Sequence, residues 1–101
     1  MKIIAKLSHQ IDEEIKDAKH YAECALKAKK KRRSLGDVYY QLSTEEMRHA
    51  NALHAEVTKI IEEYRQKHGD PPEIMQQLYD YMHDQAVAKM NEVTTLQQMY
   101  T

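Results

Sequence analysis

The sequence has few of the residues that interrupt helices or cross-link chains. Its 101 residues include two glycines, two prolines, one cysteine, and neither tryptophan nor phenylalanine. The single Cys24 excludes an intramolecular disulfide and any metal site built from four thiolates. Scarce glycine and proline, with apolar volume supplied by Met, Leu, Ile, Tyr and Ala, favour helices over strands. We therefore predict an all-α fold.

The chain also lacks a large excess of charge and a long apolar run. There are 15 basic and 16 acidic side chains, so the formal net charge is -1 and no overall field attracts nucleic acid or an anionic membrane. Residues 1–7 are too few and too charged for a signal peptide or a membrane span. The basic residues within 27–33 complement the negative end of the first helix dipole. We expect a cytoplasmic protein that binds neither nucleic acid nor membrane.

The glycines and prolines fall at only two places, which divide the chain into three segments. Gly36 followed by Asp37 predicts the end of one helix and the N-cap of the next. Gly69 followed by Asp70 and two prolines predicts the same change again. We expect a single domain, residues 1–101, in which a short first connection makes the first two helices an antiparallel hairpin. The predicted helices cover about residues 3–33, 37–67 and 72–100.

Ionisable side chains interrupt the apolar stripes of the first two predicted helices. At 3.6 residues per turn, Glu46 and His49 fall among the inward positions of the second helix, and Glu14 falls on the stripe of the first. Burying a carboxylate without a partner is costly, so these groups must meet a cation, a hydrogen-bond network or a metal. The predicted inward positions are Ile4, Leu7, Ile11, Glu14, Ala18, Tyr21 and Ala25, then Tyr39, Leu42, Glu46, His49, Leu53, Val57, Ile60 and Tyr64.

The third predicted helix has no acidic residue in the middle of its apolar face. Its stripe consists of Met75, Leu78, Tyr79, Met82, Ala86, Met90, Val93, Leu96 and Tyr100. We interpret this methionine-rich stripe as adaptable core or subunit interface. His9, His20, His54 and His68 are predicted to lie on the surface, and His83 is at most a flanking ligand.

The spacing of Glu46 and His49 suits metal binding. Side chains three residues apart on a helix have Cβ atoms about 5 to 6 Å apart, so both can reach one ion. Carboxylate oxygens combined with an imidazole nitrogen suit Fe, Mn or Zn. The alternative is that Glu14, Glu46 and His49 form a buried ion-pair and hydrogen-bond network that fixes the helix register without a metal.

These residues resemble part of a known family. Glu14, Tyr21 seven residues later, and Glu46-Met47-Arg48-His49-Ala50 look like the first half of a ferritin-like carboxylate bundle of the bacterioferritin and rubrerythrin type. The resemblance covers about residues 3–65. In that family each half of a four-helix bundle supplies one Glu and one Glu-x-x-His, and the two halves hold two metals. It implies that Glu14 and His49 are terminal ligands, Glu46 a bridging ligand and Tyr21 a hydrogen-bonding group behind them.

The resemblance also implies an assembly, because one chain supplies only half of such a site. A two-fold dimer would gather four carboxylates and two imidazoles, as in the encapsulated ferritins, whose small chains build a di-iron site across a dimer interface. Met47 matches the haem-binding position of bacterioferritins, and we interpret it as a methionine at the flank of the helix. The absence of a Cys-x-x-Cys pair argues against electron delivery through a rubredoxin-type iron.

Two functional hypotheses follow. In the first, a homodimer or larger oligomer completes a four-helix bundle and holds two Fe ions per dimer, with Mn or Zn as alternatives. Its site would oxidise ferrous iron or reduce oxygen or peroxide, with Glu14, Glu46 and His49 as the reactive centre. In the second, the chain is a non-enzymatic helical assembly or interaction protein that has a structural metal or a buried ion-pair network.

Overall fold

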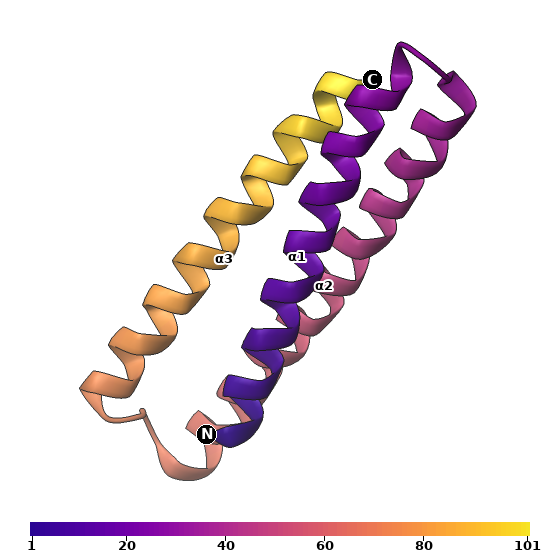
Figure 1. Ribbon diagram of the computed structural model, residues 1–101. Coiled ribbons are helices and arrows are strands. Elements are labelled where there is room, and N and C mark those ends of the chain that lie inside the picture. The colour runs from indigo at the N-terminus through magenta and orange to yellow at the C-terminus, as the bar shows by residue number, and fades with distance from the viewer.

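The molecule consists of three long helices that form a rod of 55 × 18 × 17 Å (Figure 1). Each helix runs antiparallel to the one before it in the chain. The structure is a computed structural model that describes residues 1–101. Helix α1 is Lys2–Lys29, α2 is Arg33–His68 and α3 is Glu73–Tyr100, and there are no strands. The all-α prediction is confirmed. None of the helices has the length and apolar character needed to cross a membrane.

Helix α1 is the central element of the fold. It packs closely along α2, and α3 lies mainly against α1 while touching α2 much less. In Figure 1 the α1 ribbon accordingly runs between the other two. The hydrophobic core is formed where α1 meets both neighbours, and it includes Ile11, Ile15, Met47, Ala50 and Val93.

Buried residues recur at intervals of seven in every helix. They are Ile4, Ile11, Ala18 and Ala25 on α1, Gly36, Ser43 and Ala50 on α2, and Ala86, Val93 and Tyr100 on α3. A seven-residue repeat keeps one seam facing a neighbouring helix and is typical of helices that cross at about 20°. Since most side chains along the α1–α2 seam are small, the two backbones can approach closely. This close contact sets the register of the hairpin.

The turn between α1 and α2 lies earlier than predicted. Residues 30–32 form it, so the predicted helix end at residue 33 and start at residue 37 are wrong. Gly36 lies inside α2, where a Cβ would come within 2.8 Å of the Tyr100 hydroxyl and 3.2 Å of the Lys29 backbone. Asp37 does not cap a helix, because it lies within α2, and its carboxylate accepts a hydrogen bond from the Tyr100 hydroxyl. Gly36 and Asp37, which predicted a turn, instead contact Tyr100 of α3.

The second turn lies where the sequence placed it. Helix α2 ends at His68, and Gly69 follows with a φ of 78°, a positive value that glycine adopts readily. Asp70 is not the N-cap of α3, which begins at Glu73 after Pro72 without a side-chain cap. The predicted boundaries therefore hold to within about one residue, although the predicted cap is wrong.

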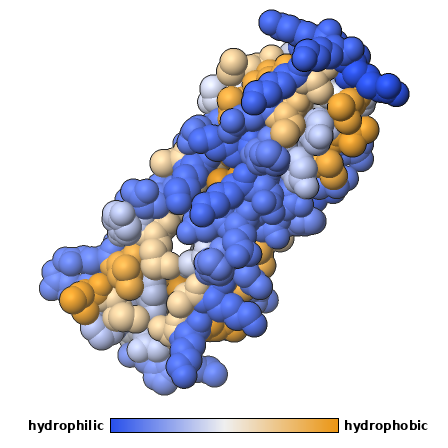
Figure 2. Space-filling view, in the orientation of Figure 1, coloured by the Kyte–Doolittle hydropathy of each residue, from blue (hydrophilic) through white to orange (hydrophobic).

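Part of the apolar surface of α3 is not covered within one chain. The predicted inward residues Ala86, Val93 and Tyr100 are buried, but Leu78 is exposed together with Ile74 and Tyr81. Figure 2 shows apolar surface near both ends of the rod, including the end where α3 begins, whereas hydrophilic side chains cover its middle. Only the second half of α3 contributes large buried side chains to the core.

Candidate metal centre

The position of the first turn places Glu14 beside Glu46 and His49. Glu14 lies 17 residues before residue 31, the middle of the turn, while Glu46 lies 15 residues and His49 18 residues after it. In an antiparallel hairpin these three positions share one level. The buried Ser43 hydroxyl donates a hydrogen bond to the Ala18 carbonyl oxygen at 2.7 Å. This bond agrees with the same alignment of α1 with α2. A turn centred on residue 35, as the predicted helix bounds imply, would have placed Glu46 opposite Cys24.

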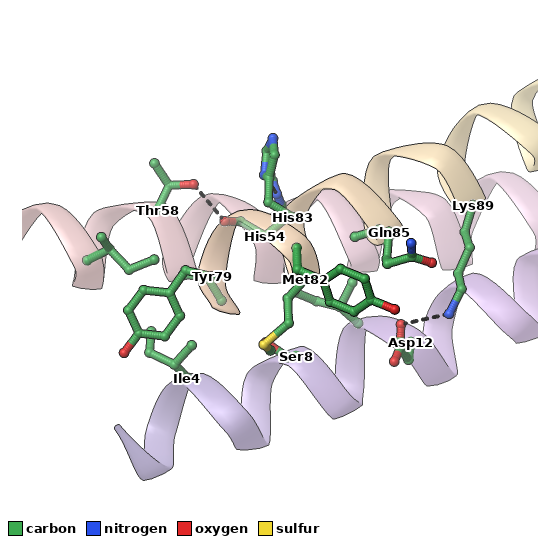
Figure 3. Close-up of a pocket in the computed structure, with 15 residues that line it drawn as sticks. Ile4, Ser8, Asp12, His54, Thr58, Tyr79, Met82, His83, Gln85 and Lys89 are labelled. Carbon is green, nitrogen blue, oxygen red and sulfur yellow. Dashed lines mark hydrogen bonds and ion pairs between the residues drawn. The ribbon is translucent and has the colours of Figure 1, made fainter. Parts of the chain in front are cut away.

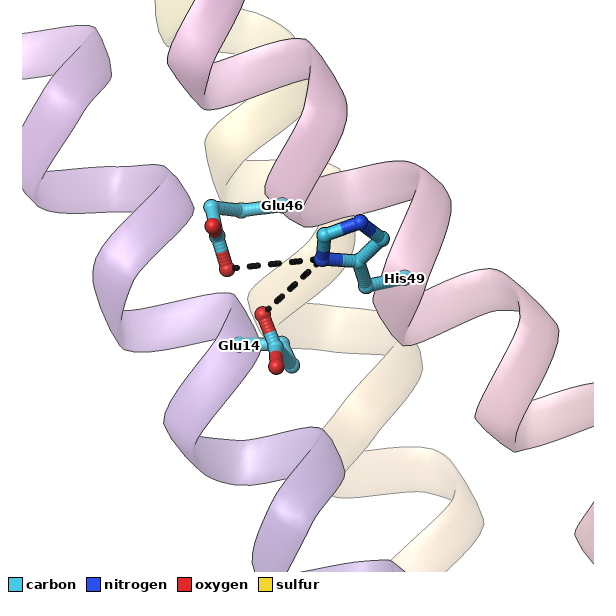
Figure 4. Close-up of side chains that lie close together, drawn as sticks. All are labelled: Glu14, Glu46 and His49. Carbon is cyan, nitrogen blue, oxygen red and sulfur yellow. Dashed lines mark ion pairs between the residues drawn. The ribbon is translucent and has the colours of Figure 1, made fainter.

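The three side chains converge between α1 and α2 (Figure 4). His49 Nδ1 lies 3.6 Å from a Glu14 oxygen and 3.9 Å from a Glu46 oxygen. One ligand atom from each residue lies within 4.8 Å of the others, and no other group of three such residues gathers in the chain. The structure therefore brings together all three residues that the sequence singled out as ligands.

These residues lie at the edge of the packed seam, not in the core. Their side chains are 28% exposed for Glu14, 21% for Glu46 and 59% for His49. The prediction that Glu46 and His49 point inward is therefore wrong for a single chain. The next residue, Met47, which the sequence placed at the flank of the helix, is only 9% exposed and belongs to the core. The seam of α2 follows Gly36, Ser43 and Ala50, which turns Glu46 to one side.

Glu14 and Glu46 belong to a half-buried row that we call the open face. Its members are Leu7, Glu14 and Tyr21 on α1, and Tyr39, Glu46 and Leu53 on α2. Figure 4 shows α3 passing behind α1 and α2 at the site, so α3 does not cover these ligands. Tyr21 stacks on Tyr39 with ring centroids 6.1 Å apart, and no hydrogen bond joins Tyr21 to a ligand. The open face is thus an apolar seven-residue pattern that one glutamate interrupts in each helix.

The closeness of the Glu14 carboxylate changes the acidity of Glu46. A hydrogen bond with Glu14, partial burial and the negative charge of Glu14 raise the pKa of Glu46 to about 7, and His49 opposes this shift. Two carboxyl groups this close resist ionising together. Either a proton or a bound cation relieves the repulsion, and a divalent cation would displace the proton.

This pKa predicts how the stability of the metal-free protein depends on pH. Because folding raises the pKa of Glu46 from 4.5 to about 7, the folded chain binds the proton more tightly than the unfolded chain. The contribution of Glu46 to the free energy of unfolding is therefore largest below pH 4.5 and is lost as the pH rises to about 7. In Glu46→Gln this loss should vanish, so the stability of the variant relative to wild type should rise between pH 5 and pH 8. Urea unfolding with a chelator measures the difference, and a pH-independent difference would contradict the assignment.

The donor set fits a transition-metal ion. Two donors that bind the same ion at about 2.0 to 2.2 Å lie roughly 3 to 4 Å apart, which is close to the separations seen at His49. Two carboxylates and one imidazole suit Fe, Mn or Zn. One chain supplies only three residues to such an ion, so further coordination positions stay open toward the uncovered side.

The sequence prediction missed a pair of histidines. His54, predicted to lie on the surface, is half-buried, and its Nε2 lies 2.9 Å from Nδ1 of His83. The signal was the seven-residue spacing that His54 shares with Met47 and Ile61, on the side of α2 that faces α3. We call the group of Glu14, Glu46 and His49 the carboxylate centre. His83, which the sequence suggested as a flanking ligand, contacts His54 and not this centre.

Comparison with known proteins adds no further assignment to this site. No protein-family model, no curated protein and no solved structure matches this chain.

Proposed function

We propose that this protein is a ferritin-like metalloprotein in which two copies of the chain enclose a dinuclear iron site. The site oxidises ferrous iron or reduces oxygen or peroxide. The observation that carries the proposal is the convergence of Glu14, Glu46 and His49, from two helices, on a face that α3 leaves open. A carboxylate-bridged pair of metals is bound by the same types of residue, in twice this number.

A second copy of the chain is the simplest completion of the site. A two-fold axis beside the open face would add the same three residues and give four carboxylates and two imidazoles. It would also cover apolar neighbours such as Leu7, Tyr21 and Leu53, which are half-buried in one chain. Removing this surface from water favours association, since buried apolar area contributes about 25 cal/mol per Å².

Each residue has a distinct part in the proposed chemistry. Glu14 and Glu46 supply the negative charge that attracts cations, and Glu46 gives up its proton when a cation binds. His49 supplies an imidazole nitrogen as donor from the more exposed side of the cluster. The bound metal supplies the one-electron steps that convert oxygen or peroxide. The apolar row around the ligands limits the access of water once a partner covers it.

Anaerobic titration with ferrous iron, followed by addition of oxygen, tests this function. We expect about two irons per dimer and a ferric absorbance after oxygen, both lost in Glu14→Ala and His49→Ala. His68→Ala is the matched control, because His68 lies exposed at the end of α2. Wild-type protein that takes up no iron, or variants that oxidise iron at the wild-type rate, would contradict the proposal.

One observation favours a second candidate function, a helical assembly protein that uses the cluster without a metal. The raised pKa of Glu46 lets a proton satisfy the carboxylate pair at neutral pH, while His49 pairs with both glutamates. In that case the same variants would change dimerisation or stability, and wild type would bind no iron.

A further inference from the structure

A second cluster of metal-binding atoms lies between α2 and α3. Nε2 of His54 on α2 is 2.9 Å from Nδ1 of His83 on α3, and the ring centroids are 4.9 Å apart. Figure 3 shows the two histidines beside a cavity of about 260 Å³ that all three helices line. His54 is half-buried and His83 is exposed, so an ion can reach the pair from solvent.

The surroundings of His54 disfavour a positive charge on its ring. One nitrogen must donate to the other, and burial together with the charge of His83 lowers the pKa of His54. The lowered pKa favours the neutral form of His54, and neutral imidazole is the commonest protein ligand for transition metals. A metal ion would take the place of the proton in their hydrogen bond.

The separation of the nitrogens is close to that of a chelating pair. Two nitrogens at about 2.05 Å from one ion lie roughly 2.9 Å apart at a right angle and about 3.4 Å apart in a tetrahedron. The observed 2.9 Å fits neighbouring positions of a square-planar or octahedral ion. Tetrahedral Zn²⁺ requires the rings to separate by about half an ångström.

We propose that His54 and His83 form a second metal site, which binds a divalent transition-metal ion such as Ni²⁺ or Zn²⁺. No carboxylate or thiol lies close enough to form a three-residue group with them, so water fills the remaining positions. The ion joins α2 to α3, two helices that otherwise touch little. It thereby holds the first half of α3, which contributes little to the core, against the hairpin. The site shares no residue with the carboxylate centre and does not depend on the proposed oxidase function.

Zinc binding to a variant without the carboxylate centre tests this site. In Glu46→Gln/His49→Ala, isothermal titration with Zn²⁺ should show one ion per chain, and adding His83→Ala should weaken binding at least tenfold. In the same variant Zn²⁺ should slow amide hydrogen exchange in the first half of α3, and His83→Ala should abolish that effect. Since His83 is exposed, its replacement should leave the helical circular dichroism unchanged.

The control variant removes another pair of soft ligands. His20 Nε2 lies 3.6 Å from Cys24 Sγ on α1, so this pair is the alternative location for a single zinc ion. His20→Ala should leave the zinc affinity and the slowed exchange of α3 unchanged. Equal binding with and without His83, or loss of binding in His20→Ala alone, would overturn the proposal. His83→Ala in the otherwise wild-type chain should still take up iron at the carboxylate centre, which separates this result from a failure of that centre.

Discussion

Replacing Glu46 with glutamine should weaken metal binding by at least about 100-fold while leaving the metal-free fold intact. Even residues that only support metal ligands change affinity 10- to 100-fold, and Glu46 is a ligand in this account. The amide has a similar shape but carries no negative charge and cannot bridge two ions as a carboxylate does. At pH 8 the same variant removes the repulsion from Glu14, so the metal-free protein should become more stable. Calorimetric titration with Fe²⁺ under anaerobic conditions and urea unfolding with a chelator measure the two effects.

Glu45 provides the matched control for this experiment. It precedes Glu46 in the chain, its carboxylate accepts a hydrogen bond from Gln41 on the same helix, and it is not a member of the cluster. Glu45→Gln removes the same charge at nearly the same place, so it should leave iron affinity within about twofold. Equal loss of affinity in both variants would mean that the net charge of α2, and not a site at Glu46, attracts the cation.

Introducing an aspartate at Val93 should destabilise the protein by about 4 kcal/mol or more. Val93 is fully buried in the core cluster, where an unpaired carboxylate has no hydrogen-bond partner. A domain of this size has a total stability of about 5 to 15 kcal/mol, so much of it would be lost. We expect Val93→Asp to lose helical circular dichroism at a much lower urea concentration than wild type, and to expose α3 to hydrogen exchange before α1.

The neighbouring Thr94 is the control for this substitution. Thr94 is exposed on the same turn of α3, and its hydroxyl donates to the Met90 carbonyl oxygen. Thr94→Asp should change the free energy of unfolding by no more than about 0.5 kcal/mol, as is usual at an exposed position. If Val93→Asp were equally mild, α3 would not be packed against the hairpin through its seven-residue pattern.

The sequence predicted the number of helices because their periodic patterns are long and their breakers few. It misplaced the first turn because Gly36 and Asp37 carry a strong turn signal for another reason. Gly36 makes room for Lys29 and Tyr100, and Asp37 binds the Tyr100 hydroxyl. Gly36 and Asp37 thus both lie against Tyr100 of α3, some 60 residues further along the chain, and a local rule could not reveal this. Gly69 meets no such contact, and its turn was predicted correctly.

The sequence predicted which residues form the site, but it did not predict how far they are exposed. Glu14, Glu46 and His49 were identified because each interrupts an apolar pattern, and the structure places them together. Periodicity alone could not show that α2 has two adjacent apolar rows, one packed against α1 and α3 and the other on the open face. The pairing of His54 with His83 depends on how α3 crosses α2, which the separate helix patterns do not determine.

Native mass spectrometry of the iron-loaded protein tests the central claim most directly, because the claim joins metal binding to assembly. One chain has a mass of 11.9 kDa. We expect a dimer at twice that mass with two irons, and we expect His49→Ala to leave no iron-loaded dimer. Iron bound to a single chain, or a dimer that forms equally well but never holds iron, would contradict a dinuclear centre shared between two copies of the open face.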